Sequence, residues 1–135
     1  MKKTVLLTGA AGFIGSNLLE YLFDRYPGYY FLVLDALTYA GNQKNIPKRI
    51  RDSGRFEFWY GDVANPYIVM ELMARANLVV HLAAETHVAR SIFDNSKFFQ
   101  TDVIGTQTMM NALLRSGRVE RFVHVSTSEV YGTAL

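Results

Sequence analysis

The 135-residue chain contains no cysteine, only three prolines and a single tryptophan. Without cysteine it has no disulfide framework, no thiolate metal site and no cysteine nucleophile, and a reducing, cytoplasmic location is expected. Apolar stretches are short, and none approaches the ~18 residues that a transmembrane helix needs. We therefore expect a globular protein of the cytoplasm with no membrane partner.

The chain also lacks a strong excess of either charge. Fourteen basic residues against twelve acidic residues give a net charge of +2, and no run of Lys or Arg exceeds two. This balance predicts no nucleic-acid partner. Hydrophobic residues make up 50% of the chain and charged residues 19%, which favours a packed domain over disorder, and the length suits a single domain.

Five short apolar segments alternate with stretches of helical periodicity. The predicted strands are Thr4–Thr8, Phe31–Asp35, Phe56–Tyr60, Leu78–Leu82 and Phe122–Ser126. Such alternation predicts an α/β fold with a doubly wound parallel sheet of the Rossmann type, and the strand order 3-2-1-4-5. Ligands of such sheets bind at the carboxyl ends of the strands, so the segments that follow Thr8 and Leu82 should face each other.

Two of the intervening segments carry a clear helical pattern. In the first, the residues predicted to face the sheet are Ile14, Leu18, Leu19 and Leu22. The second is predicted to begin near Asn95 or Ser96 and to run to about Arg115, with Gly117 as its stop. It has more apolar residues than one sheet-facing stripe needs. Either a second face is buried by further chain or another subunit, or the helix surface is simply apolar.

A glycine-rich turn follows the first predicted strand and opens the first helix. Gly9, Gly12 and Gly15 have the spacing G-x-x-G-x-x-G, in which glycines permit a tight turn and close approach to a pyrophosphate. Asp35 stands twenty positions beyond Gly15, at the end of the second strand. A carboxylate there accepts hydrogen bonds from the adenosine ribose and repels a 2′-phosphate, which predicts NAD rather than NADP. Asp62, after the third strand, is predicted either to contact adenine or to cap a helix.

The histidines give weaker signals. His81, Glu85 and His87 do not have a spacing typical of metal ligands, so no metal site is expected. His124, in the last predicted strand, is expected to be a hydrogen-bonded core residue.

Four segments carry a resemblance to a known family. They are Thr8–Asn17 (TGAAGFIGSN), Leu34–Asn42 (LDALTYAGN), His81–Val88 (HLAAETHV) and Ser126–Gly132 (STSEVYG). Together they resemble the extended short-chain dehydrogenases/reductases, and within these the nucleotide-sugar 4,6-dehydratases, dTDP-glucose 4,6-dehydratases above all. The resemblance implies a lyase that uses NAD to turn a nucleotide-activated hexose into its 4-keto-6-deoxy sugar. NAD takes hydride from C4, water leaves across C5 and C6, and hydride returns to C6.

The resemblance also implies residue roles. Backbone groups of Phe13 and Ile14 would contact the pyrophosphate. The adenosine would be held by Asp35, Leu37, Thr38, Asp62 and Val63. The path to the nicotinamide would be lined by Leu82, Ala83, Ala84, Thr86, Thr101 and Ser126. In catalysis, Thr127 would orient the 4-hydroxyl and Glu129 would remove the C5 proton.

The sequence departs from this pattern in two ways. Ser128 stands where dTDP-glucose enzymes place an acidic residue that protonates the leaving C6 hydroxyl, and serine is a poor general acid. Thr-Ser-Glu resembles instead GDP-mannose 4,6-dehydratases and UDP-glucuronate decarboxylases. The alternatives are therefore a UDP-glucuronate decarboxylase, a nucleotide-sugar 4-epimerase or a non-catalytic dinucleotide-binding module.

The second departure is the absence of a Tyr-x-x-x-Lys pair. Residues 1–135 are accordingly expected to be the incomplete NAD-binding domain of a longer enzyme, without its last strands and sugar-binding lobe, and to be inactive alone. The full-length enzyme is expected to be a homodimer. The residues predicted for its subunit surface are Phe99, Val103, Met110 and Leu114.

Overall fold

The structure, a computed structural model, describes residues 2–86 and 88–133. Its centre is a five-stranded parallel sheet with the order β3-β2-β1-β4-β5. The strands are β1 (Thr4–Thr8), β2 (Tyr30–Asp35), β3 (Phe56–Tyr60), β4 (Leu78–His81) and β5 (Arg121–His124). The predicted fold and strand order are confirmed. Strands β4 and β5 end one and two residues earlier than predicted.

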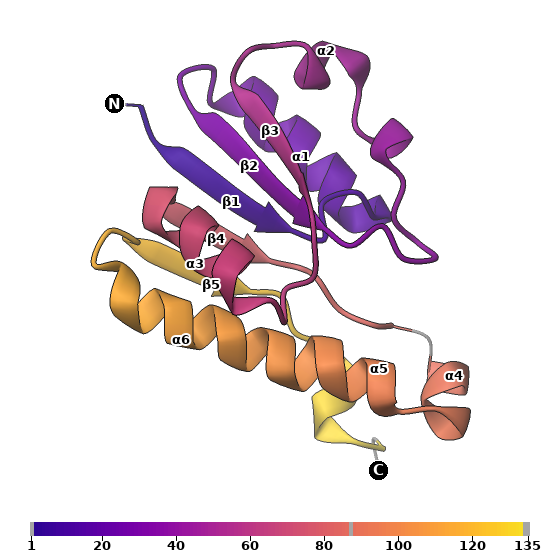
Figure 1. Cartoon of the computed structure of the whole chain (residues 1–135). Coiled ribbons are helices and arrows are strands. Elements are labelled where there is room, and N and C mark those ends of the chain that lie inside the picture. Colours follow the sequence, from indigo (N-terminus) through magenta and orange to yellow (C-terminus); the bar gives the residue numbers. More distant parts are fainter. Residues whose placement is uncertain (1, 87, 134–135) are drawn as a thin grey trace.

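Helices cover both faces of the sheet (Figure 1). On one face lie α1 (Phe13–Arg25) and α2 (Lys48–Arg51), and on the other lie α3 (Pro66–Arg75) and α6 (Thr106–Ser116). Because side chains alternate along a strand, β1 sends Leu6 into one core and Val5 and Leu7 into the other. The remaining elements are η1 (Gln43–Asn45), α4 (Val88–Phe93), α5 (Ser96–Phe98), the π-helical segment η2 (Phe99–Gly105) and η3 (Ser128–Tyr131).

The predicted sheet-facing stripe of α1 is wrong at its first position. Leu19 and Phe23 are buried, and Leu18 and Leu22 pack against the same core. Ile14, however, is 68% exposed. The glycine turn places the first turn of α1 beyond the carboxyl ends of the strands, so Ile14 has no sheet beneath it.

The long helix predicted from about Asn95 to Arg115 is present as α5, η2 and α6, which form one continuous ribbon (Figure 1). Gly117 ends it in the left-handed conformation, with φ of 57°. Met109 and Ala112 are buried against the sheet. Phe99, Val103 and Leu114 are 58%, 50% and 85% exposed, so the second apolar face has no cover within the described chain. No helix among residues 2–86 and 88–133 is long and apolar enough to cross a membrane.

A polar network joins β2, β3 and α3. The carboxylate of Glu57 accepts hydrogen bonds from Arg75 (2.6 and 3.0 Å), from the Tyr30 hydroxyl (2.7 Å) and from the Trp59 indole (3.1 Å). The Arg75 guanidinium, together with the other two donors, lowers the pKa of Glu57 to about 2. The network therefore links strand and helix through one ionised carboxylate.

Glu57→Gln is expected to lower the free energy of unfolding at pH 7 by about 1–2 kcal/mol, an effect limited by partial solvent exposure. The folded-state pKa lies below the unfolded value, so the carboxylate stabilises the fold above pH 4.5 and loses this effect as the pH falls toward 2. Urea unfolding of the unsubstituted protein and of the Glu57→Gln variant should show that the difference between their free energies of unfolding shrinks as the pH falls through this range. The exposed Glu71 on α3 offers a matched control, since Glu71→Gln should change stability little at any pH. An unchanged gap between pH 7 and pH 3 would contradict the assignment.

Candidate functional site

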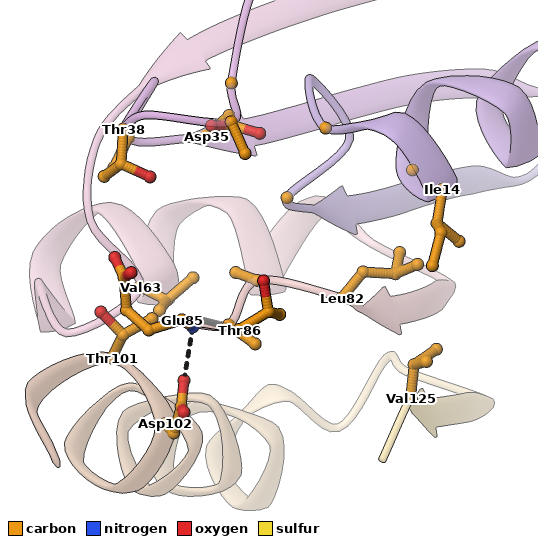
Figure 2. Close-up of a pocket in the computed structure, with 18 of the residues that line it drawn as sticks. Ile14, Asp35, Thr38, Val63, Leu82, Glu85, Thr86, Thr101, Asp102 and Val125 are labelled. Atoms are coloured by element: carbon orange, nitrogen blue, oxygen red, sulfur yellow. Dashed lines mark hydrogen bonds between the residues drawn. The ribbon is translucent and has the colours of Figure 1, made fainter. Parts of the chain in front are cut away.

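A cavity of about 900 Å³ lies at the carboxyl ends of the strands. Its walls come from the glycine turn after β1 and from the segments that follow β2, β3, β4 and β5, with η2 along one side (Figure 2). This is the switch point of the sheet, where β1 lies between β2 and β4. The volume is within the range of cofactor sites in proteins.

The glycine turn leaves the start of α1 open to the cavity. The N-cap of α1 is Gly12, so no N-cap side chain hydrogen-bonds to the first N–H groups of the helix, and the first turn contains no acidic residue. Phe13 is 83% exposed beside Ile14. Backbone N–H groups at such a helix start, together with the helix dipole, attract a phosphate group.

Two glycines of the turn are required by its packing. Gly9 has φ of 73°, and a Cβ there would lie 2.8 Å from the backbone of Ala83. A Cβ on Gly15 would lie 2.4 Å from the Gly9 carbonyl oxygen and 2.6 Å from Ala10 Cα. At Gly12, in contrast, the nearest atom would be 3.4 Å away. Gly9 and Gly15 therefore shape the turn, whereas Gly12 leaves open space toward the cavity.

Asp35 is almost completely buried at the end of β2. One carboxylate oxygen accepts a hydrogen bond from the Ala11 N–H (2.9 Å) and the other accepts one from the Leu37 N–H (2.8 Å). Leu37 has φ of 50°, a strained value for a residue with a side chain. A carboxylate offers about four acceptor positions, so the two that remain suit a pair of ribose hydroxyls.

Asp62 makes a local turn. Its carboxylate accepts from the Ala64 N–H (2.8 Å), and the N-cap of α3 is Asn65. The alternative that Asp62 caps the helix is wrong. Asp62 and Val63 do line the cavity, next to the end of β3.

The segment after β4 is held by side chains from other elements. Thr8 Oγ1 accepts from the N–H groups of Leu82 and Ala83, both at 3.2 Å, and lies 2.6 Å from Nδ1 of His81. Because the Thr8 hydroxyl oxygen already accepts two hydrogen bonds, we infer that the hydroxyl donates its own hydrogen to Nδ1 of His81. Nδ1 is then an acceptor, so the ring hydrogen is assigned to Nε2, which lies 3.4 Å from Thr106 Oγ1. Burial lowers the pKa of His81 to about 4, so the ring is neutral at pH 7.

The π-helical segment brings two successive residues, Thr101 and Asp102, to the cavity wall. Asp102 accepts a hydrogen bond from the Glu85 N–H at 2.8 Å, as Figure 2 shows. Burial raises the pKa of Asp102, and the Glu85 N–H opposes this rise. On the opposite wall, the side chains of Ile14 and Leu82 extend toward one another (Figure 2). Sequence reasoning did not identify Asp102 as a site residue, because only the fold places it beside the segment after β4.

The charged side chains that the structure describes along the cavity wall are all acidic. Five carboxylates lie along its walls, and none of the described lining residues is Lys or Arg. The acidic residues are Asp35, Asp62, Glu85, Asp102 and Glu129. Among the described lining residues, the groups that suit an anionic ligand are backbone N–H groups, and none is a cation that could pair with a ribose 2′-phosphate. The described residues contain no group of three or more His, Cys, Asp or Glu arranged to hold a metal ion.

The segment after β5 brings two of the predicted catalytic residues to the cavity wall. Thr127 and Glu129 line the cavity, and Thr127 Oγ1 accepts from the Glu129 N–H at 3.2 Å at the start of η3. Ser128 does not line this cavity but a smaller hollow with Glu129. The prediction of a buried, hydrogen-bonded His124 is wrong, because β5 is an edge strand and His124 is exposed, facing the cavity.

The structure brings together all but two of the predicted site residues. Leu37 lies outside the cavity and donates its N–H to Asp35, and Ser128 lies in the adjacent hollow. Tyr39, Glu85, Asp102, Thr106 and His124 also line the cavity, although the sequence analysis assigned them no role in the site. His87, which the sequence excluded as a metal ligand, lies outside the described residues.

A parallel sheet of this order, with a glycine turn at its switch point, defines a Rossmann-type domain. The family model described as GDP-mannose 4,6 dehydratase matches residues 6–135, and the chain belongs to this family. The resemblance inferred from the sequence is confirmed.

Individual relatives agree with this assignment. A dTDP-glucose 4,6-dehydratase from Streptomyces antibioticus is 49% identical over 134 residues, covering 96% of this chain and 38% of that protein. The crystal structure of a dTDP-glucose 4,6-dehydratase from Streptomyces venezuelae with NAD and TYD bound matches with a TM-score of 0.89 and 42% identity, over 98% of this chain and 42% of that one. A UDP-glucose 4-epimerase from Thermotoga maritima, solved with UDP-glucose, matches with a TM-score of 0.84 and 27% identity, over 98% of this chain and 40% of that one. The chain thus spans about two fifths of the length of these relatives.

Proposed function

We propose that the chain binds NAD in the cavity at the carboxyl ends of the strands. The observation that carries this proposal is an uncapped glycine turn next to a buried aspartate, within walls that have no Lys or Arg among the described lining residues. The turn suits a pyrophosphate, and Asp35 suits a ribose with free hydroxyls. The relative from Streptomyces venezuelae, solved with NAD, supports the same choice.

We further propose that residues 1–135 form the NAD-binding domain of a longer nucleotide-sugar 4,6-dehydratase that acts on dTDP-glucose. The relative from Streptomyces antibioticus carries this name, and the present chain covers 38% of it. Asp35, Asp62 and Val63 would hold the adenosine half of the coenzyme, and the segment after β5 would face its nicotinamide half. A cytoplasmic location stays a prediction.

In this reaction, bound NAD supplies reversible hydride transfer to and from the sugar. Thr127 offers its hydroxyl to the sugar 4-hydroxyl and orients it for loss of its proton. The Glu129 carboxylate removes the C5 proton, which is acidic once C4 carries a carbonyl. Both groups are supplied by one short turn at the end of β5, so the geometry of η3 sets their spacing.

Ser128 favours a second candidate. No carboxyl group occupies this position, and the serine lines the hollow shared with Glu129. A UDP-glucuronate decarboxylase or a nucleotide-sugar 4-epimerase expels no C6 hydroxyl and needs no acid there. The Thermotoga maritima epimerase shows that this fold also occurs in enzymes of that kind.

Coenzyme binding tests the first proposal. Titration of the chain with NADH and NADPH, followed by nicotinamide fluorescence, should show binding of NADH and at least tenfold weaker binding of NADPH. Equal affinity, or a preference for NADPH, would remove Asp35 from the argument.

Turnover of nucleotide sugars tests the proposed 4,6-dehydratase activity. The protein from the full reading frame would be incubated separately with dTDP-glucose, UDP-glucuronate and GDP-mannose. We expect a 4-keto-6-deoxy product from dTDP-glucose. Release of carbon dioxide from UDP-glucuronate without turnover of dTDP-glucose would favour the second candidate instead.

We also propose that the full-length enzyme is a homodimer that uses the exposed apolar face of the long helix. Phe99, Val103 and Leu114 lie on this face, and Met110 is only partly buried. Sedimentation of the full-length protein should give a dimer, and Leu114→Glu should shift it toward monomer. A monomer at high protein concentration before substitution would contradict this proposal.

A further inference from the structure

A side-chain contact joins the two loops that flank β1 at the cavity. Tyr39 belongs to the loop after β2, and Thr86 to the loop after β4. The Tyr39 hydroxyl lies 3.1 Å from Thr86 Oγ1, and the Thr86 N–H points to the same hydroxyl at 3.5 Å. Both residues line the cavity. Since β2 and β4 are on opposite sides of β1, this contact spans the crevice at the switch point.

Both loops are anchored close to this contact. Thr8 holds the N–H groups at the start of the loop after β4, and Asp102 holds the Glu85 N–H directly before Thr86. On the other side, the Gly41 N–H bonds to the Thr38 carbonyl at 2.9 Å, and the Asn42 N–H ties this loop to the Ala11 carbonyl of the glycine turn at 3.1 Å. The Tyr39–Thr86 contact therefore joins two fixed supports rather than two loose segments.

The contact itself is easily broken. Tyr39 is 44% exposed and Thr86 is also exposed, and neither belongs to a hydrophobic core. A hydrogen bond between exposed neutral groups contributes little to the stability of the fold. Opening it would therefore leave the rest of the domain intact.

We propose that Tyr39 and Thr86 form a latch across the bound dinucleotide that slows its release. This inference rests on the proposed NAD site. A ligand that runs from Asp35 to the segment after β5 must pass between the two loops that the latch joins. Slow release suits a reaction in which the same coenzyme molecule takes hydride from the sugar and returns it, because release is then not part of each turnover.

Dissociation kinetics test the latch. The chain would be loaded with NADH, mixed with excess NAD, and the loss of nicotinamide fluorescence followed by stopped flow. Tyr39→Phe removes only the hydroxyl and should speed dissociation about three- to tenfold, the range expected for one neutral hydrogen bond. The association rate should change little. Tyr21→Phe removes a hydroxyl from an exposed tyrosine of α1 that does not line the cavity, and should leave both rates unchanged.

A double-mutant cycle then asks whether Tyr39 acts through Thr86. In a Thr86→Val background, where only the long contact from the Thr86 N–H at 3.5 Å remains, Tyr39→Phe should have at most a small further effect on dissociation. In a Thr86→Ser background, where the hydroxyl remains, its effect should persist. Thermal unfolding of each chain should match the unsubstituted chain, which separates the latch from a general loss of structure.

The outcomes are distinct. NADH binding with an unchanged dissociation rate in Tyr39→Phe would overturn the latch and leave the NAD site standing. Faster association of NADH with an unchanged dissociation rate would show that the contact obstructs entry of the coenzyme, and this result would also overturn the latch. Additive effects of Tyr39→Phe and Thr86→Val would mean that Tyr39 acts through another group. Failure of the unsubstituted chain to bind NADH would overturn the NAD site and, with it, the latch.

Discussion

A Gly12→Ala chain is expected to fold normally and to bind NAD about 100-fold more weakly, or worse. A Cβ at Gly12 meets nothing closer than the Gly9 carbonyl oxygen at 3.4 Å, and φ of −79° is allowed for alanine. The new methyl group instead occupies space at the start of α1, where the pyrophosphate is proposed to approach the backbone. Steric displacement and the loss of charge-assisted hydrogen bonds together cost about 3–5 kcal/mol.

Gly15→Ala provides the contrast, because its Cβ would lie 2.4 Å from the Gly9 carbonyl oxygen. Relief of this contact must move backbone, so the free energy of unfolding should fall by about 1–3 kcal/mol or more, together with binding. Calorimetric titration with NAD measures the affinity of the Gly12→Ala and Gly15→Ala variants, and urea unfolding measures their stability. If Gly12→Ala binds NAD as the unsubstituted chain does, the pyrophosphate does not lie on this turn.

Asp35→Asn is expected to weaken NAD binding about 10- to 100-fold and to reduce the preference for NAD over NADP by at least tenfold. The carboxylate lends its charge to the hydrogen bonds from the ribose, and each such bond is worth about 1.5–3 kcal/mol. The same charge repels a 2′-phosphate, a cost of several kcal/mol that the amide removes. Because no Lys or Arg is among the described lining residues, NADP should gain relative to NAD without becoming a strong ligand.

The substitution also has a cost for the fold. Asp35 accepts from two backbone N–H groups, and an asparagine presents its own amide hydrogens to one of them. Stability should therefore fall by about 1–3 kcal/mol. Asp52→Asn, which changes the same charge at an exposed position away from the cavity, should alter neither stability nor coenzyme preference appreciably. An unchanged NAD-to-NADP ratio in Asp35→Asn would contradict the proposed ribose contact.

Local sequence patterns predicted the elements of the site well. Buried parallel strands are short apolar runs, so their positions and order follow from composition and the crossover rule. The glycine spacing, with Asp35 twenty positions after Gly15, predicted which loops meet. Two of the wrong predictions concern burial, since Ile14 and His124 have apolar neighbours in sequence but lie beyond or at the edge of the sheet.

Contacts between distant segments could not be predicted in this way. The Glu57 network joins residues of β2, β3 and α3, and the Asp102 and Tyr39 contacts join residues 17 and 47 positions apart. No local pattern marks such pairs, because each depends on where two separate elements come to rest. The π-helical segment that presents Thr101 and Asp102 together is likewise invisible in the apolar spacing of the long helix.

The amino-acid sequence by itself determined the parallel α/β architecture, the strand order and the glycine turn, because hydrophobic periodicity and glycine spacing act over a few residues. Only the tertiary structure decided which charges line the cavity, how Asp35 is held and that Tyr39 reaches Thr86. The physical reason is that electrostatics and hydrogen bonding in a site depend on distances of 3–5 Å between atoms, and folding alone sets those distances for residues far apart in the chain.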